Sequence, residues 1–230
     1  MTKILLVEDE EPIRKFVKLN LEREGYEVFQ AGSGEEGLEL AYKEFPDIVV
    51  LDVMLPGIDG FEVCKRLREK FPSLGIIMLT AKSEDYDKIL GLQYGTDDYM
   101  SKPFNPTELT LRIRSLERRI LGSESTTGAI IIHPPFKLDA YSRKFYKDDK
   151  EIDLTPTEYL IIKNFMENSG KALSRDEILN LVWGNEFVGD TKIVDVNIRR
   201  LRSKIEKSAA KPEYIETVWG LGYRWNGKNS

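Results

Sequence analysis

Histidine and cysteine are nearly absent from this chain of 230 residues, which contains one of each, His133 and Cys64. A single cysteine excludes a disulfide within the chain and zinc clusters built on cysteine. His133 lacks partners for a metal site and precedes two prolines, so we expect it at the end of a strand. Cys64 shares a predicted helix with apolar residues, so we expect it in the core.

Long apolar segments are also missing. No run of about 18 apolar residues occurs, so the sequence predicts no transmembrane span. The first residues, MTKILLVEDEE, become acidic after one short apolar run, unlike a signal peptide. We therefore expect a cytoplasmic protein without membrane attachment. Apolar residues still make up 41% of the chain, which is enough for folded cores, and the length suits one large domain or two ordinary ones.

Acidic residues outnumber basic ones by 39 to 34, but they are unevenly distributed. Residues 1–121 carry 23 acidic and 17 basic side chains, whereas residues 122–230 carry 16 and 17. Within the second part, the segment 191–207 holds six basic residues against two acidic ones. This asymmetry indicates divided functions, and the basic segment outweighs the overall acidity as a signal for nucleic-acid binding.

Strand and helix patterns alternate through residues 1–121. Short apolar runs predict strands, and apolar residues three or four positions apart predict helices. The strands are expected at 3–7, 26–30, 48–51, 75–79 and 98–100, and the helices at 12–25, 34–45, 61–71, 84–94 and 106–121. Such alternation predicts an α/β domain with a doubly wound, parallel, five-stranded sheet covered on both faces.

The pattern changes after the small polar segment 122–128, which predicts a linker. Residues 129–230 are expected to form a second, α+β domain. Its strands are expected at 129–133, 136–139, 144–147, 152–154, 214–219 and 223–225, and its helices at 156–167, 174–182 and 191–207.

Three carboxylates fall at the carboxyl ends of predicted strands: Glu8 and Asp9 after the first strand, and Asp52 after the third. Open α/β sheets bind ligands beyond these ends, and in the strand order 2-1-3-4-5 the first and third strands are neighbours. The three side chains would then converge. A hard divalent cation such as Mg²⁺ suits this all-oxygen set.

Thr80 ends the fourth predicted strand and Lys102 follows the fifth, so a hydroxyl and an ammonium group join the same rim. Together with the carboxylates they indicate phosphoryl transfer, with Asp52 as the nucleophile because it stands alone at its strand end. Taken singly, each of these residues fits a structural role better, as a helix cap or a solvated charge. Five suitable residues at four strand ends favour the functional interpretation.

Four motifs carry a resemblance to a known family: LLVEDE, the MLPGIDG that follows Asp52, LTAK around Thr80, and DDYMSKPF around Lys102. They resemble the receiver domain of bacterial response regulators over the whole first half. The resemblance implies that a sensor histidine kinase phosphorylates Asp52. It implies the following site: Glu8, Asp9, Asp52 and the Met54 backbone carbonyl on Mg²⁺, Thr80 and Lys102 on the phosphoryl oxygens, and Tyr99 as an aromatic switch.

The same resemblance implies a homodimer that forms on phosphorylation. Its expected face carries opposite charges and consists of Lys88, Asp97, Asp98, Glu108, Arg112 and Arg114. Contacts between two receivers would be of the kind Lys88–Glu108 and Asp98–Arg112.

The basic segment 191–207 combines two stripes. Val194, Ile198, Leu201 and Ile205 recur at helical spacing and are expected in the core, while basic residues are expected on the opposite face. Such a helix can enter a major groove. The expected DNA contacts are Arg200 on a base edge, Val196 on a thymine methyl group, Lys192, Arg202 and Lys204 on phosphate, and Arg199 beside them. The alternative is a solvated helix face, and the hairpin around Gly220 and Gly222 tips the balance because it supplies a β-wing.

LTPTEYLII, LSRDEILNLVWG, VDVNIRRLRSKIE and IETVWGLGYRW resemble the winged-helix domain of the OmpR/PhoB family. The resemblance implies a recognition helix at 191–207, a loop at 183–190 that is available to RNA polymerase, and promoter DNA read as direct repeats. One departure is Trp219, which stands where some members carry an arginine in the wing. We expect all three tryptophans, Trp183, Trp219 and Trp225, to be packing residues.

Two rival interpretations come from other classes of protein. A Mg²⁺-dependent phosphatase also uses a nucleophilic aspartate, but it needs a second aspartate close behind, which Asp52-Val53-Met54 lacks. A constitutive DNA binder would use the receiver only for dimerisation, and the complete pocket argues against it. We therefore expect a non-enzymatic, DNA-binding transcription regulator controlled by phosphorylation of Asp52.

Overall fold

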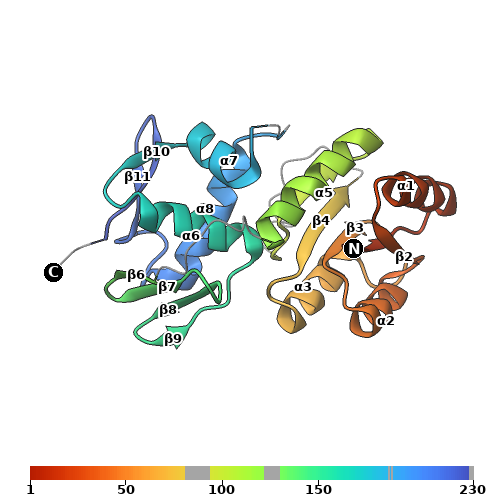
Figure 1. Ribbon diagram of the computed structural model, residues 1–230, viewed down its shortest axis with the longest axis horizontal. Coiled ribbons are helices and arrows are strands. Elements are labelled where there is room, and N and C mark those ends of the chain that lie inside the picture. The colour runs from red at the N-terminus through yellow and green to blue at the C-terminus, as the bar shows by residue number, and fades with distance from the viewer. Residues whose placement is uncertain (81–93, 122–129, 186, 188, 228–230) are drawn as a thin grey trace. The chain divides into compact units, whose positions relative to one another are not determined.

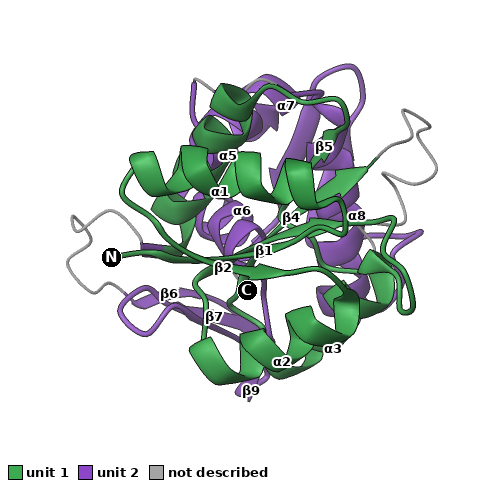
Figure 2. Ribbon diagram, turned by 90° about the vertical axis from the view of Figure 1, so that its right-hand side faces the viewer, with its two compact units in different colours: residues 1–120 green, residues 121–230 purple. Residues whose placement is uncertain are grey.

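The computed structural model describes residues 1–80, 94–121, 130–185, 187 and 189–227. The chain forms two compact units, Met1–Ile120 and Leu121–Ser230 (Figure 2). The predicted linker, Lys88 and nearly all of the helix predicted at 84–94 lie outside the described residues. Among the helices that are described, none combines the length and apolar character that a membrane crossing requires.

The first unit contains a five-stranded sheet (Figure 1), and its strands lie in the order β2-β1-β3-β4-β5. Its strands are β1 (Lys3–Val7), β2 (Glu27–Ala31), β3 (Ile48–Asp52), β4 (Gly75–Thr80) and β5 (Asp98–Ser101). All neighbouring strands are parallel. β3 and β4 are buried over their whole length, as strands covered on both faces must be. The doubly wound fold and its strand order are confirmed.

Helices cover both faces of this sheet. They are α1 (Glu11–Arg23), α2 (Gly34–Glu44), α3 (Gly60–Lys70) and α5 (Pro106–Leu121). α2 and α3 cover one face, and α1 and α5 cover the other (Figure 2). Successive residues of a strand point to opposite faces: Leu5 of β1 packs in the core with α2 and α3, and Leu6 packs in the core with α1 and α5. Cys64 is fully buried in the first of these cores, as expected.

The second unit has the expected α+β composition, with two antiparallel sheets in the orders β6-β7-β8-β9 and β10-β12-β11 (Figure 1). Its strands are β6 (Ile130–His133), β7 (Phe136–Asp139), β8 (Lys144–Lys147), β9 (Lys150–Glu151), β10 (Ala172–Ser174), β11 (Ile215–Val218) and β12 (Gly222–Trp225). Its helices are α6 (Pro156–Glu167), α7 (Arg175–Trp183) and α8 (Lys192–Ile205). His133 ends β6, as predicted.

Two strands differ from the prediction. The strand expected at 152–154 is instead β9, because Asp148 and Asp149 both adopt positive φ and form a tight turn that pairs Lys147 with Lys150. β10 was not expected. It pairs with β12 through Gly222, where any side chain would collide with the Leu173 carbonyl oxygen.

The tryptophans divide into two groups. Trp183 and Trp225 are fully buried, as expected, but Trp219 is 92% exposed, so its predicted packing role is wrong. The reason is that β11 and β12 pair only as far as Val218 and Gly222, which leaves residues 219–221 as a turn beyond the sheet.

Candidate metal centre and nucleic-acid interface

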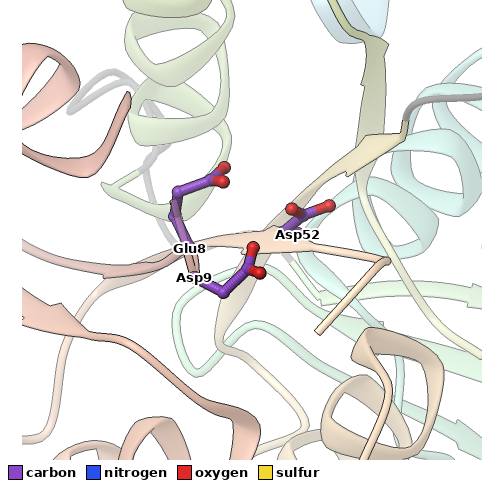
Figure 3. Close-up of side chains that lie close together, drawn as sticks. All are labelled: Glu8, Asp9 and Asp52. Atoms are coloured by element: carbon purple, nitrogen blue, oxygen red, sulfur yellow. The ribbon is translucent and has the colours of Figure 1, made fainter. Parts of the chain in front are cut away.

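An acidic pocket lies beyond the carboxyl ends of β1 and β3. Glu8 and Asp9 follow β1, and Asp52 is the last residue of β3, which pairs directly with β1. Carboxylate oxygens of the three residues lie within 4.8 Å of one another (Figure 3). Glu8 and Asp52 are buried and Asp9 is exposed, so the pocket opens to solvent on one side. The predicted convergence is confirmed.

Lys102 reaches this pocket from the segment after β5. Its Nζ donates to Asp52 Oδ2 at 2.6 Å and to Glu8 Oε1 at 2.8 Å. Burial alone would lower the pKa of Lys102, but the bonds to the two carboxylates outweigh it and raise the pKa above its usual value. Burial raises the pKa of Glu8. The ammonium group therefore stays charged beside Asp52.

The backbone fixes the other edge of the pocket. Thr80 ends β4 and is buried, and its carbonyl accepts a bond from the Lys102 N–H at 2.7 Å, so the hydroxyl-bearing and ammonium-bearing residues are held together. The Met54 N–H donates to Asp52 Oδ1 at 3.0 Å and orients that carboxylate. Tyr99 is partly buried and packs against the core with α2 and α3.

The donor set fits a divalent cation. Glu8, Asp9 and Asp52 carry three negative charges, and Lys102 supplies one positive charge against them. Two negative charges in excess at one point, all on oxygen, match what Mg²⁺ requires. Glu8, Asp9 and Asp52 would hold the ion.

The second region is helix α8. Val194, Ile198, Leu201 and Ile205 are fully buried, which confirms the predicted core stripe. Arg199 and Lys192 are exposed, and Val196 is partly exposed. Helix α7, with its own capping box at Ser174, precedes α8 as in a helix-turn-helix.

Arg200 does not lie on the exposed face, so the expectation that it reads a base edge is corrected. It is 8% exposed, and its Nη2 lies 2.9 Å from Glu158 Oε1 on α6. Lys204 Nζ lies 2.7 Å from the other Glu158 oxygen. The physical reason is that a long side chain on the flank of the helix reaches a buried carboxylate that needs partners.

Glu158 is a structural residue of this region that the sequence analysis did not single out. It is the third residue of α6 and completes a capping box with Thr155. Burial would raise the pKa of Glu158, but Arg200 and Lys204 outweigh it and lower the pKa below its usual value. The T-x-x-E pattern at 155–158 was the available signal.

Arg202 is also occupied within the unit, instead of facing phosphate as expected. Its guanidinium donates to the Ile215 carbonyl at 2.6 Å and to Thr217 Oγ1 at 2.9 Å, both on β11. The basic stripe therefore divides: Arg200, Arg202 and Lys204 hold α8 in place, whereas Lys192 and Arg199 face outward.

Two family models match the chain, "Response regulator receiver domain" over residues 4–114 and "Transcriptional regulatory protein, C terminal" over residues 149–225. The alkaline phosphatase synthesis transcriptional regulatory protein PhoP of Bacillus subtilis (strain 168) is 45% identical over 230 residues, with 96% of this chain and 95% of PhoP covered. The structure of DrrB, a Thermotoga maritima OmpR/PhoB homolog, is 35% identical with a TM-score of 0.53 and covers 99% of this chain and 100% of DrrB. This chain belongs to the OmpR/PhoB family of response regulators. The structure of a RitR mutant is 28% identical with a TM-score of 0.79 and covers 98% of this chain and 99% of RitR.

A response regulator of this type is a DNA-binding regulator of a two-component system, and receivers of this class bind Mg²⁺ at such an acidic pocket. The predicted family and the two folds are thus confirmed. No enzyme family is indicated by these matches.

The charged residues expected on a receiver–receiver face are bound within the receiver itself. Arg112 pairs with Asp98 at 2.9 Å and with Glu108 at 2.7 Å. Asp97 is fully buried and accepts bonds from Arg68 at 2.9 Å and from the Ile76 N–H at 3.0 Å. Asp98 is also fully buried, and burial raises its pKa. Both aspartates are thus engaged within the receiver, and their part in a contact between two receivers stays a prediction.

Arg114 is the last residue of this set that the structure describes. It pairs with Glu24, which follows α1, so it is also engaged within the receiver.

Proposed function

We propose that Asp52 accepts a phosphoryl group from a histidine kinase and that this transfer controls the binding of promoter DNA. The observation that carries the proposal is the pocket, in which Asp52 lies among two further carboxylates and 2.6 Å from an ammonium group. An Asp52 oxygen attacks phosphorus, the bond from phosphorus to the donor imidazole nitrogen breaks, and that nitrogen keeps the electron pair. The product is an acyl phosphate on Asp52.

Lys102 and Thr80 provide the positive charge and the hydroxyl group for the transferred phosphoryl oxygens. Lys102 pairs with Asp52 before transfer and needs to move only from a carboxylate oxygen to a phosphoryl oxygen. A divalent cation on Glu8, Asp9, Asp52 and the Met54 carbonyl would neutralise charge on the same group. Tyr99 would be the aromatic switch that responds to phosphorylation of Asp52.

The acceptor is tested with a small radiolabelled phosphodonor and Mg²⁺. Asp52→Asn should abolish the label. Asp59→Asn is the matched control, because Asp59 caps α3 by accepting from the Glu62 N–H and asparagine caps a helix equally well. Undiminished labelling of Asp52→Asn would place the acceptor elsewhere.

Phosphorylation is also proposed to favour a homodimer through the face around Glu108. Arg112→Glu is a poor test because Arg112 holds buried Asp98. Glu108→Gln is better, since its amide oxygen can still accept from Arg112 while the charge is removed. Individual exposed pairs contribute only about 0–1 kcal/mol, so a modest loss of dimer affinity with full labelling is expected in sedimentation of the phosphorylated chain. An unchanged dimerisation constant would contradict this face.

The second unit is proposed to place α8 in the major groove, with the hairpin β11–β12 as its wing. Arg199 replaces Arg200 as the base-reading arginine: it is exposed, one helical turn after Asp195, and among the described residues no hydrogen bond or ion pair engages its guanidinium. Val196 is proposed to contact a thymine methyl group and Lys192 a phosphate. We also propose that the protein reads promoter DNA as direct repeats and that the loop at 183–190 contacts RNA polymerase.

Regulated binding is tested by gel retardation of promoter fragments with and without the phosphodonor. Stronger retardation after phosphorylation is expected for the wild type and not for Asp52→Asn. Equal retardation in both states would favour a constitutive DNA binder.

A further inference from the structure

One carboxylate joins α8 to the two elements beside it. Asp195 lies in the first turn of α8, and its Oδ1 accepts a bond from Tyr223 Oη on β12 at 2.7 Å. The same oxygen accepts from Arg175 Nε, at the start of α7, also at 2.7 Å. Three elements therefore meet on a single oxygen atom.

The donors of this junction are themselves fixed. The Tyr223 side chain is buried, with the guanidinium groups of Arg175 and Arg202 at 5.1 Å and 5.4 Å from its ring centroid. Burial and the bond to Asp195 raise the pKa of Tyr223 to about 12, so the phenol keeps its proton and donates at neutral pH. The buried phenol of Tyr223 and the guanidinium of Arg175 therefore fix the position of Asp195 Oδ1.

The second oxygen of Asp195 is different. Both of these hydrogen bonds go to Oδ1, and in the described part of the chain none goes to Oδ2, while the side chain is 40% exposed. Asp195 precedes Val196 and lies one helical turn before Arg199 and one after Lys192. It therefore shares the helix face that carries the proposed DNA contacts.

We propose that Asp195 determines base specificity by accepting a hydrogen bond at Oδ2 from an exocyclic amino group in the major groove, that of cytosine N4. This inference rests on the proposed placement of α8 in the groove. Residues near the start of a recognition helix contact base edges, and a carboxylate pairs with the amino group of cytosine. A carboxylate near the phosphates weakens binding to every DNA sequence by repulsion. A hydrogen bond from a base amino group offsets this repulsion, so DNA sequences that lack such a donor at this position bind more weakly. Tyr223 and Arg175 are positioning residues that aim the carboxylate.

A purely structural Asp195 would act differently. An acidic residue in the first turn stabilises the helix dipole, and the junction braces the hairpin. Removing such a residue would weaken binding to all sequences by a common factor.

The experiment uses the full chain and a pool of random duplexes. Duplexes selected by the wild type are changed one base pair at a time, and dissociation constants are measured for each change and for a scrambled duplex. Asp195→Ala should lose on the order of tenfold discrimination at one C·G pair, with affinity for scrambled DNA unchanged or higher. Asp195→Asn should move the preference at that pair towards A·T, because asparagine pairs bidentately with adenine.

Tyr223→Phe tests the positioning role, because it keeps the ring and removes only the hydroxyl group, which donates to Asp195 and accepts from Arg175. Discrimination should fall at the same base pair, while binding to scrambled DNA stays unchanged. Glu216→Gln is the control on the same hairpin: Glu216 accepts hydrogen bonds from Arg224 and Asn226, so specificity should persist.

Three results would decide against the proposal. A uniform loss of affinity in Asp195→Ala, an unaltered preference in Asp195→Asn, or equal effects of Tyr223→Phe and Glu216→Gln would each assign Asp195 a structural role. If the wild type selects no duplex at all, the proposed DNA binding itself fails, which is a separate outcome. If Asp195→Ala does not fold, Asp195→Asn decides, since it is nearly isosteric.

Discussion

The acidic pocket and helix α8 both concentrate charge of one sign, but they differ in how far the charged side chains are paired within their own unit. In the pocket, Lys102 pairs with Glu8 and Asp52 while Asp9 lies beside them, so the negative charges outnumber the positive charge of the lysine. On α8, by contrast, Arg200 and Lys204 share a buried carboxylate and Arg202 bonds to β11. Carboxylates that outnumber their cationic partners fit a ligand site, whereas basic side chains that all have partners inside the unit hold α8 in place.

The largest effect is expected when Glu158, the carboxylate that Arg200 and Lys204 share in the second unit, is removed. Glu158→Ala leaves the Arg200 guanidinium buried without its partner, and breaking a buried pair costs about 3–5 kcal/mol. Urea unfolding of the intact chain, followed by tryptophan fluorescence, measures this loss, because all three tryptophans lie in the second unit. Glu216→Gln, which alters an exposed pair, is the control and should change little.

If Glu158→Ala lowers the free energy of unfolding by less than about 1 kcal/mol, Glu158 does not hold Arg200 and Lys204 as a buried ion pair would. The ion pair between Arg200 and Glu158 would then contribute no more than an exposed pair does.

The pocket gives the second test, because uncompensated charge should be relieved by a cation. Mg²⁺ at about 100 times its dissociation constant should stabilise the first unit by about 2.7 kcal/mol. Calorimetry should show one transition moving upward while the tryptophan-detected transition stays in place. Asp9→Asn removes the charge of an exposed ligand and should reduce the shift, whereas Asp59→Asn should keep it. A shift of both transitions, or of neither, would argue against a cation site.

The fold and the pocket were largely predictable from the sequence, for a topological reason. Parallel strands end at the same edge of a sheet, so residues placed at strand ends, such as Asp52 and Lys102, converge whatever their rotamers. Apolar runs and glycine boundaries placed those ends within one or two residues.

The orientation of long side chains could not be predicted in the same way. Helical spacing placed Arg200 opposite the core, but its partner Glu158 comes from 42 positions earlier and is brought near only by packing of α6. The pairing of Arg112 with Asp98 inside one receiver was not predicted either, since sequence alone does not show that both side chains are buried. The turn at Asp148 and Asp149 was missed because aspartate adopts left-handed backbone less often than glycine.

The third test separates the two arginines that stand side by side on α8. Losing a base contact costs about 1–3 kcal/mol on the preferred sequence and relaxes preference at one position. Arg199→Ala should show this, while Arg200→Ala should mainly lower stability to urea. Binding is titrated on selected and scrambled duplexes at several salt concentrations. If Arg199→Ala lost affinity equally on both duplexes, Arg199 would be a phosphate contact instead.

The smallest expected effect distinguishes the two kinds of titrating group in the second unit. His133 Nδ1 accepts a hydrogen bond from Trp225 Nε1 at 3.0 Å, which joins β6 to β12, and burial lowers the pKa of His133. A depressed pKa means that the neutral imidazole stabilises the fold above its unfolded value of about 6.5, and that this stability is lost as pH falls through the folded pKa. The imidazolium cannot accept the bond, so about 0.5–1.5 kcal/mol should be lost as pH falls below the unfolded pKa of about 6.5. The pKa of Glu158 is also lowered, so its contribution to stability is present above its unfolded pKa and is lost only as pH falls through still lower values. The pH ranges in which His133 and Glu158 lose their contributions therefore do not overlap.

Fluorescence-detected urea unfolding at several pH values measures the loss of stability that His133 causes. His133→Gln, whose amide oxygen accepts without titrating, should flatten it, and a step that persists in this variant would assign the pH dependence to another group.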